Sequence, residues 1–371
     1  MINKAYNLIK DHHKSLNIPY TPQTSVISPL FQGQFNYCLD EIHWYKKYKH
    51  FTKINEEEHF QKIMPAIRLA DYKKYYTANA PSPDHLAIFT ISTLSGAHIG
   101  TAEQYEYYLD YAIKNMIDFL TKKAGLSIEK LKVSYFGGGM TPKEIEQSRK
   151  NEKQTLFILA NKKIPADNLS PLLWKKYGLK NEQLLVDYSR DTFLTNNWYL
   201  CRGPWGYRNE IYYQLQNGHY LDIATIEFLK YTPIVEYRDG KSYCLSYKPW
   251  KQSLIIDGLG VERLALAKSD LNDIYDLPDY HKLLKLAKSK EIEAIRILHR
   301  VYTDSKGEKI NSRQRKDKLK KLIRKINNLS IEEIKEILTE NEKIYSNIFP
   351  ELQTGTDLTL SAIKKYRLKI K

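Results

Sequence analysis

The chain has 371 residues and a formal net charge of +15, with 42% hydrophobic and 27% charged residues, which is ordinary for a globular protein. Its apolar runs are far shorter than the roughly 18 residues that a membrane-spanning helix needs. The three cysteines, Cys38, Cys201 and Cys244, are odd in number and far apart, and no HExxH pattern occurs, so neither a disulfide framework nor a structural metal site is expected.

The charge and the N-terminus bear on partners and location. A strongly basic protein often binds a polyanion, usually nucleic acid. The alternative is that lysine is enriched for genomic reasons, because Asn, Ile and Tyr are abundant too. The polar start MINKAYNLIKDHHK lacks the apolar stretch of a secretory signal, so a cytoplasmic protein without a membrane partner is expected.

In chain order, the first half mixes helices and strands. Helices are predicted over 1–16, 40–64 and 101–124, the last with Tyr105, Leu109, Ala112, Met116 and Leu120 on one side. Strands are predicted at 66–69, 85–92 and 130–136, strand plus loop at 22–36, and a long loop at 71–84. After three glycines, Thr141 and Pro142 predict the start of a helix.

The second half changes from strands to helices. Residues 185–260 alternate strand-like runs with Gly and Asn turns, which predicts antiparallel β-structure. After Val261 the chain is helical and basic, and further helices are predicted at 313–325, 331–345 and 356–369. The predicted fold class is therefore α+β, an antiparallel sheet flanked by helices in a domain at 1–265, followed by a basic helical domain at 266–371.

The sharpest local pattern is IIDGLGVERLA at Ile255–Ala265. Gly258 and Gly260 allow a tight turn between a strand and a helix. Arg263 in the first helical turn is disfavoured by roughly several tenths of a kcal/mol, so an anion or a π-system is expected beside it. The alternative is an ordinary surface ion pair.

This segment resembles motif 3 of class II aminoacyl-tRNA synthetases. Three further segments, in matching order and spacing, resemble the alanyl type: NWYL with GPWGYRNEIYY at 197–213, LDIATIEF at 221–228, and NSRQRKDKLKKLIRK at 311–325. The resemblance extends from residue 1 to about residue 350. It implies the class II sheet and an ATP-dependent ligase that forms an aminoacyl adenylate, with ATP and Mg²⁺ as cofactors and an amino acid and a tRNA or another acceptor as partners.

The resemblance also implies roles for particular residues. Arg68 takes the position of the motif 2 arginine and Arg263 that of motif 3, both catalytic and both contacting ATP. Attack of a carboxylate on the α-phosphate concentrates negative charge, which two arginines and Mg²⁺ would stabilise. The other implied residues are His85, Phe89, Asp222, Gly258 and Gly260 for ATP, with Asp222 as a Mg²⁺ or ribose partner; Trp198, Glu227 and Asp257 for the amino acid; and Arg313, Arg315, Lys320, Lys321 and Arg324 for nucleic acid. The alternatives are an interior ion pair for Arg68 and core packing for Phe89 and Trp198.

The chain departs from the family pattern around the amino acid. Thr90 replaces a motif 2 glutamate, and Ile256 replaces the aspartate that would hold the substrate ammonium. Asp257 follows one residue later and should point away, because strand side chains alternate. Glu227 replaces a small apolar residue and could receive the ammonium or a cationic side chain, so alanine is not assigned.

Three functions remain open from the sequence. The chain could be a stand-alone, divergent paralogue that charges a tRNA. It could pass the activated amino acid to a small molecule or carrier protein, or be a non-catalytic regulatory subunit. An oligomer is also left open, because the motif 1 candidate at Val26–Asn36 is too divergent to decide it.

Overall fold

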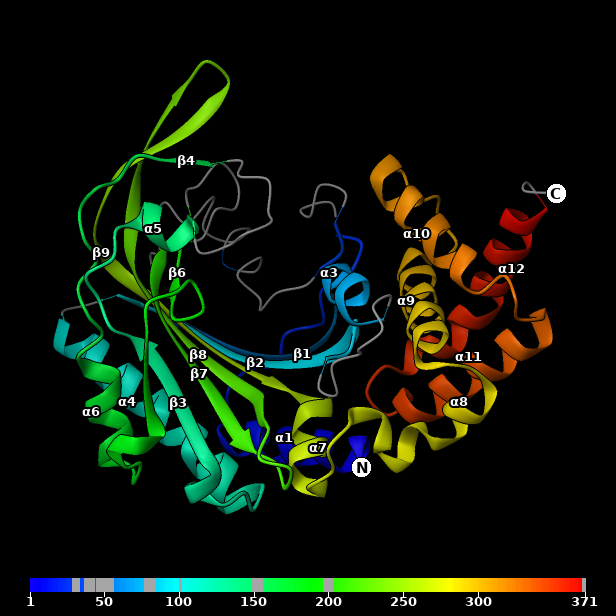
Figure 1. The fold of residues 1–371 in the computed structure, drawn as a ribbon, viewed down its shortest axis with the longest axis horizontal. Helices are drawn as coiled ribbons and strands as arrows, with labels where there is room; N and C mark the ends of the chain where they lie inside the picture. The colour runs from blue at the N-terminus through cyan, green and yellow to red at the C-terminus, as the bar shows by residue number, and fades with distance from the viewer. Residues whose placement is uncertain are drawn as a thin grey trace.

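A large, curved, mostly antiparallel sheet is the centre of the computed structural model (Figure 1). The structure describes residues 1–28, 34–36, 44, 57–76, 85–99, 102–147, 156–195 and 203–368. Within this part of the chain, no helix is long and apolar enough to cross a membrane.

The sheet has one dominant strand order. Its main path runs β1-β2-β9-β8-β7-β3-β5, and every pairing along it is antiparallel except β3 with β5. Two short strands lie off this path, β4 beside β9 and β6 beside β7. The strands are β1 (Glu58–Ile67), β2 (Ile88–Ile99), β3 (Leu131–Phe136), β4 (Leu156–Ile158), β5 (Leu184–Asp187), β6 (Phe193–Leu194), β7 (Trp205–Gln214), β8 (Tyr220–Arg238) and β9 (Lys241–Gly260).

Helices cover one face of the sheet and form a separate layer beside it. Below the sheet in Figure 1 lie α1 (Ile2–Ser15), α4 (Ala102–Asp118), α6 (Leu169–Lys176) and α7 (Val261–Ser269). Beside it lie α8 (His281–Leu286), α9 (Ser289–Ser305), α10 (Arg313–Lys325), α11 (Ile331–Tyr345) and α12 (Gly355–Arg367). Short helices α3 (Leu69–Asp71) and α5 (Pro142–Gln147) follow β1 and β3 along the chain.

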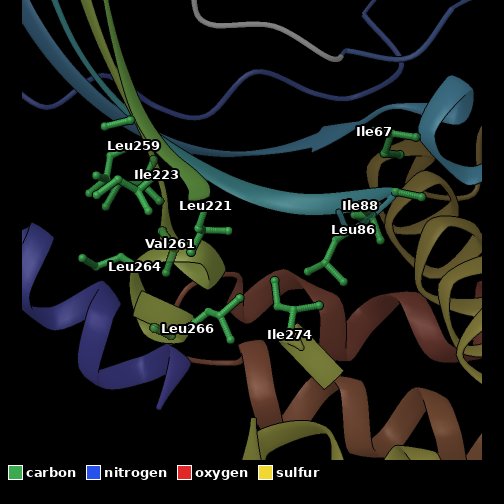
Figure 2. Close-up of a cluster of buried hydrophobic side chains, with 14 of the residues drawn as sticks. Ile67, Leu86, Ile88, Leu221, Ile223, Leu259, Val261, Leu264, Leu266 and Ile274 are labelled. Carbon is green, nitrogen blue, oxygen red and sulfur yellow. The ribbon is translucent and has the colours of Figure 1, made fainter. Parts of the chain in front are cut away.

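Side-chain alternation gives the sheet two different faces. On the helix-covered face, apolar residues of strand ends and of α7 form one core, which Figure 2 shows around Leu221, Ile223, Leu259 and Val261. On the opposite, concave face a smaller apolar cluster contains Met64, Ile91, Leu229, Leu254 and Ile256. The strands are therefore buried on both sides.

The predicted fold class is confirmed, and most predicted elements are found. The helices at 1–16, 101–124, 313–325, 331–345 and 356–369 correspond to α1, α4 with the π-turn Phe119–Lys123, α10, α11 and α12. The helix after Thr141 and the β-rich stretch 185–260 are also found. The predicted boundary at residue 265 falls inside α7, and the division into two domains stays a prediction.

The helix predicted over 40–64 is wrong in its described C-terminal part. Glu58–Ile67 form β1, so the strand predicted at 66–69 starts eight residues earlier and Leu69 already begins α3. Because β1 is buried on both faces from Phe60 onward, it lacks the alternation that marks a half-exposed strand. The strand expected within 22–36 is not observed among its described residues.

A buried polar network joins the helical layer to the sheet. Glu293 of α9 accepts hydrogen bonds from the amides of Ala87 (2.7 Å) and Ile88 (3.1 Å) where β2 begins, and pairs with Arg296. Arg296 also donates to the Tyr345 hydroxyl (2.7 Å), which in turn donates to Glu262 of α7 (2.9 Å). Each of these charged side chains is almost fully buried, so each depends on the others for compensation.

We expect Arg296→Leu to lower the free energy of unfolding by about 3–5 kcal/mol, because it leaves buried Glu293 without its cation. Denaturant unfolding would measure this against Lys285→Ala, which removes an exposed lysine of α8. A loss below about 1 kcal/mol would show that the network is not a coupled unit.

Candidate active site on the concave face

The motif 2 candidates meet at the end of β1. Arg68 directly follows this strand, and its amide donates to the Ala87 carbonyl (2.8 Å), which fixes the backbone there. Ala66 of β1 pairs with Phe89 of β2. The Arg68 guanidinium lies 5.0 Å from the centre of the Phe89 ring, so the two implied ATP residues form a cation–π pair.

The motif 3 candidate lies across the sheet from this pair. α7 starts directly after β9, and the Arg263 side chain lies over Gly260, 3.4 Å from where a Cβ would stand. Its guanidinium donates to the Asp222 carbonyl (2.8 Å) and to the Asp222 carboxylate (2.5 Å). The positive charge of Arg263 at the N-terminus of α7 is thus compensated by the carboxylate of Asp222 in β8.

A third arginine completes the group, and sequence reasoning missed it. Arg208 of β7 pairs with buried Glu210 and donates from Nε to the Thr225 hydroxyl (3.3 Å). Both Arg208 and Glu210 belong to the GPWGYRNEIYY segment, whose likeness to the alanyl type was noted without a role for either residue. Two opposite charges at alternate positions of a mostly buried strand were the available signal.

The strand register places these residues on one face. Arg208 pairs with Glu227, Glu227 with Ile256, and Ile256 with Ser95. Residues paired directly across neighbouring strands project to the same side. The concave face therefore carries Phe89, Arg208, Glu210, Thr225, Glu227, Ile256, Gly258 and Gly260.

The charges on this face influence one another. The pKa of Arg68 is lowered by burial first and then by Arg263, with a further contribution from Arg208. Burial raises the pKa of Glu227 to about 7, although Arg208 and Arg68 oppose the shift. Arg208 and Arg263 are already paired with Glu210 and Asp222, and an anion bound near the three arginines would gain charged hydrogen bonds from them.

The charged residues of the concave face lie next to an apolar region. Glu227 is 5% exposed, and its Oε2 has no hydrogen-bond partner among the described residues. Its neighbour Ile256 belongs to the concave-face cluster, together with Leu194 and Leu229. A ligand with an anionic group, a cationic group and an apolar part would match this surface.

Sequence comparison identifies relatives with a named activity. Alanine–tRNA ligases of Mesomycoplasma hyopneumoniae strains 232 and 7448 are each 24% identical to the chain over 237 residues, which is 58% of this chain. The match spans only 22% of the length of those relatives. No family model matches. The chain is similar to class II aminoacyl-tRNA synthetases.

Solved structures of such synthetases show a looser likeness. The RNA-binding domain of threonyl-tRNA synthetase from Cryptosporidium parvum Iowa II has a TM-score of 0.44 at 10% identity, over 72% of this chain and 64% of that one. Histidyl-tRNA synthetase from S. aureus gives 0.37 at 10% identity, over 72% and 65%. Pyrrolysyl-tRNA synthetase PylSc from Desulfitobacterium hafniense gives 0.35 at 7% identity, over 74% and 71%.

One candidate amino-acid residue, Asp257, lies away from the concave face. Asp257 projects to the helix-covered face, where it lines a cavity of about 30 Å³ with His12 and His13 of α1, and burial raises its pKa well above the usual value. The alternation of side chains along β9 separates it from Ile256. Trp198 lies outside the described residues, as do residues 77–84 of the predicted motif 2 loop.

Two further positions of the segment that resembles motif 2 make other contacts. His85 lies before β2, and its carbonyl accepts a hydrogen bond from the Tyr76 hydroxyl. Thr90 faces the helices, where its hydroxyl donates to Glu262 (2.9 Å) and its amide to the same carboxylate. The missing motif 2 glutamate is therefore at a position that does not face the concave surface.

The candidate nucleic-acid residues of α10 divide into two groups. Arg313, Lys320, Lys321 and Arg324 are exposed. Arg315 is buried and donates to the carbonyls of Ile27 (2.6 Å), Ser28 (2.5 Å) and Gln34 (2.8 Å). It lies four residues before buried Leu319, so helical spacing puts it on the inner side and gives it a packing role.

We expect the free energy of unfolding to fall as pH rises from about 4.5 to about 7, in part because of Glu227. Its folded pKa of about 7 lies above its ordinary value of 4.5, so the folded state binds the proton more tightly and loses this advantage as the carboxyl ionises. Glu227→Gln should reduce that slope. Denaturant unfolding between pH 4.5 and 8 measures it, and an unchanged slope would contradict the buried-carboxyl assignment.

Proposed function

We propose that the concave face activates an amino acid with ATP, forming an aminoacyl adenylate. The observation that carries this proposal is the group of three arginines, in which Arg208 and Arg263 lie near enough to Arg68 to lower its pKa, and Arg68 itself lies over the Phe89 ring. Cations within reach of an aromatic ring suit a nucleotide, which has a triphosphate and a flat base. The likeness to alanine–tRNA ligases supports the same chemistry.

The chemistry needs little from the protein beyond charge and position. A carboxylate oxygen of the amino acid attacks the α-phosphorus of ATP, and the bond from that phosphorus to the β,γ-phosphate group breaks, which releases pyrophosphate. Negative charge develops on the α-phosphate oxygens, and Arg68 and Arg263 would stabilise it. Phe89 would stack on the adenine.

Mg²⁺ would arrive with the ATP phosphates. No group of three or more metal-binding side chains is found among the described residues, and Mg²⁺ in nucleotide sites commonly relies on one or two carboxylates plus phosphate oxygens. Asp222 fits this role, because its side chain is 36% exposed beside Arg263. When bound, the ion would neutralise charge on the phosphates.

The substrate ammonium would bind to Glu227. The family's aspartate is replaced by Ile256, but Glu227 is the residue paired with Ile256 on the next strand. Directly paired residues have Cβ atoms about 4.5–5.5 Å apart, so the carboxylate is displaced by one strand and stays on the same face. Its buried, unpartnered Oε2 is a suitable acceptor for an ammonium.

This displacement weighs against a non-catalytic role. The two departures that favour such a role are Thr90 and Ile256, which replace a glutamate and an aspartate of the family pattern. Thr90 lies on the face away from the arginines, and Ile256 has a carboxylate beside it. The charge of α10 indicates which acceptor could receive the aminoacyl group. Its exposed cations suit a polyanion such as tRNA. A small-molecule or carrier-protein acceptor is the alternative.

Arg263→Ala should abolish ATP binding and leave the fold intact, because this side chain is 19% exposed and pairs with a more exposed acid. Calorimetric titration with ATP and thermal unfolding would be compared with Lys285→Ala. A loss of melting temperature as large as that of Arg296→Leu would instead make Arg263 structural.

Amino-acid-dependent ATP–pyrophosphate exchange tests the proposal as a whole. Measured without tRNA against all twenty amino acids and common non-protein ones, it should detect exchange with at least one. If the protein neither catalyses exchange nor binds ATP, the proposal that it activates an amino acid is wrong.

Transferring the carboxylate from position 227 to position 256 tests the role of Glu227. Glu227→Ile should raise the KM for the amino acid at least about tenfold, since one charged hydrogen bond is worth roughly 1.5–3 kcal/mol. The double variant Glu227→Ile/Ile256→Asp restores a carboxylate at the paired position and should recover much of the loss. No recovery, with an intact fold and normal ATP binding, would remove Glu227 from the ammonium site.

A further inference from the structure

The β8–β9 hairpin extends well beyond the sheet. β8 pairs with β7 only as far as Tyr231, whereas its pairing with β9 continues to Arg238 and Lys241 around a turn at Asp239 and Gly240. In Figure 1 this two-stranded ribbon projects at the top left. Among the described residues, the short strand β4 pairs with it, for example Phe157 with Tyr243, and the residues that follow β4 contact Cys244 and Tyr247. Two-stranded ribbons are marginally stable alone, so the extension needs a reason.

The tip carries a row of stacked cations and rings. The Phe157 and Tyr243 rings lie 5.2 Å apart at an angle of 25°. The Lys241 ammonium lies 5.3 Å from the Phe157 ring, and the Arg238 guanidinium lies 4.4 Å from the Tyr243 ring. Arg238 and Lys241 are exposed, Phe157 is 41% exposed, and nearby Tyr237 is 61% exposed.

The charge of the ribbon is positive. Between residues 232 and 248 there are three cations, Arg238, Lys241 and Lys248, and two carboxylates, Glu236 and Asp239. A surface on which flat groups alternate with cations can bind unpaired nucleotides. The bases stack on aromatic rings or guanidinium planes, and the phosphates pair with the cations. An apolar protein partner would be a poor match for this charge.

We propose that the tip of the β8–β9 hairpin binds single-stranded RNA, with a base stacked on the outer plane of Arg238 and phosphates near Lys241. Figure 1 supports a link to the concave face, because the hairpin and α10 flank that face and both project upward. An RNA held by both would pass over the arginine group. The link to the acceptor rests on the proposed function, whereas RNA binding by the tip is independent of it.

The experiment compares two double charge reversals in the full chain. Arg238→Glu/Lys241→Glu changes the tip. Lys175→Glu/Lys285→Glu makes the same change in charge on exposed lysines of α6 and α8. Binding of a fluorescein-labelled, mixed-sequence 20-nucleotide RNA is measured by anisotropy from 50 to 300 mM salt, beside a duplex of the same sequence.

We expect the tip variant to weaken binding of the single strand at least about tenfold at low salt, and to lower the slope of log K against log salt by at least about 0.7, as for one lost phosphate contact. The control should change affinity less than about twofold. Arg238→Lys keeps the positive charge but removes the flat guanidinium. It should weaken binding of the single strand more than binding of the duplex.

Equal losses in both double variants, or none, would overturn the proposal. A tip variant that alters the sedimentation coefficient but not RNA affinity would make the hairpin a surface for self-association instead. Pyrophosphate exchange without RNA should be unchanged in the tip variant, so failure of RNA binding and failure of amino-acid activation are read separately.

Discussion

The alternation of side chains along strands that are buried on both faces is the constraint on which the site depends. Because each residue of β8 and β9 faces either the helices or the concave surface, a single position decides whether a carboxylate can take part in chemistry. Asp257 and Ile256 are neighbours in sequence and face opposite ways. Glu227 restores an acid to the concave side because it is paired with Ile256.

The helical layer contributes through a second constraint, the compensation of buried charge. Glu293 and Glu262 accept hydrogen bonds from the backbone of β2 on either side of Phe89, while Arg296 and Tyr345 hold those two acids from the helices. The strand that carries Phe89 is thus fixed by residues more than 170 positions away in sequence. This explains how the C-terminal helices can affect a site whose residues they do not supply.

Local sequence was sufficient to predict the helices and strands that have one side exposed to solvent. The helices α1, α10, α11 and α12 follow from amphipathic spacing, and the β-rich stretch follows from its turns. It failed at β1, where burial on both faces removed the alternation that identifies a strand. Similarly, Arg315 was grouped with the exposed cations of α10 because charge, rather than its place on the inner side of the helix, guided the prediction.

The sequence by itself determined the class of fold and the likeness to class II synthetases, since these rest on short-range patterns and ordered motifs, and that likeness named Arg68 and Arg263 as candidate site residues. The tertiary structure alone decided that Arg208 joins them, that Thr90 and Asp257 do not face them, and that Glu227 lies beside Ile256. The physical reason is strand register. Which residues stand opposite one another depends on pairings between distant segments, and no local pattern encodes them.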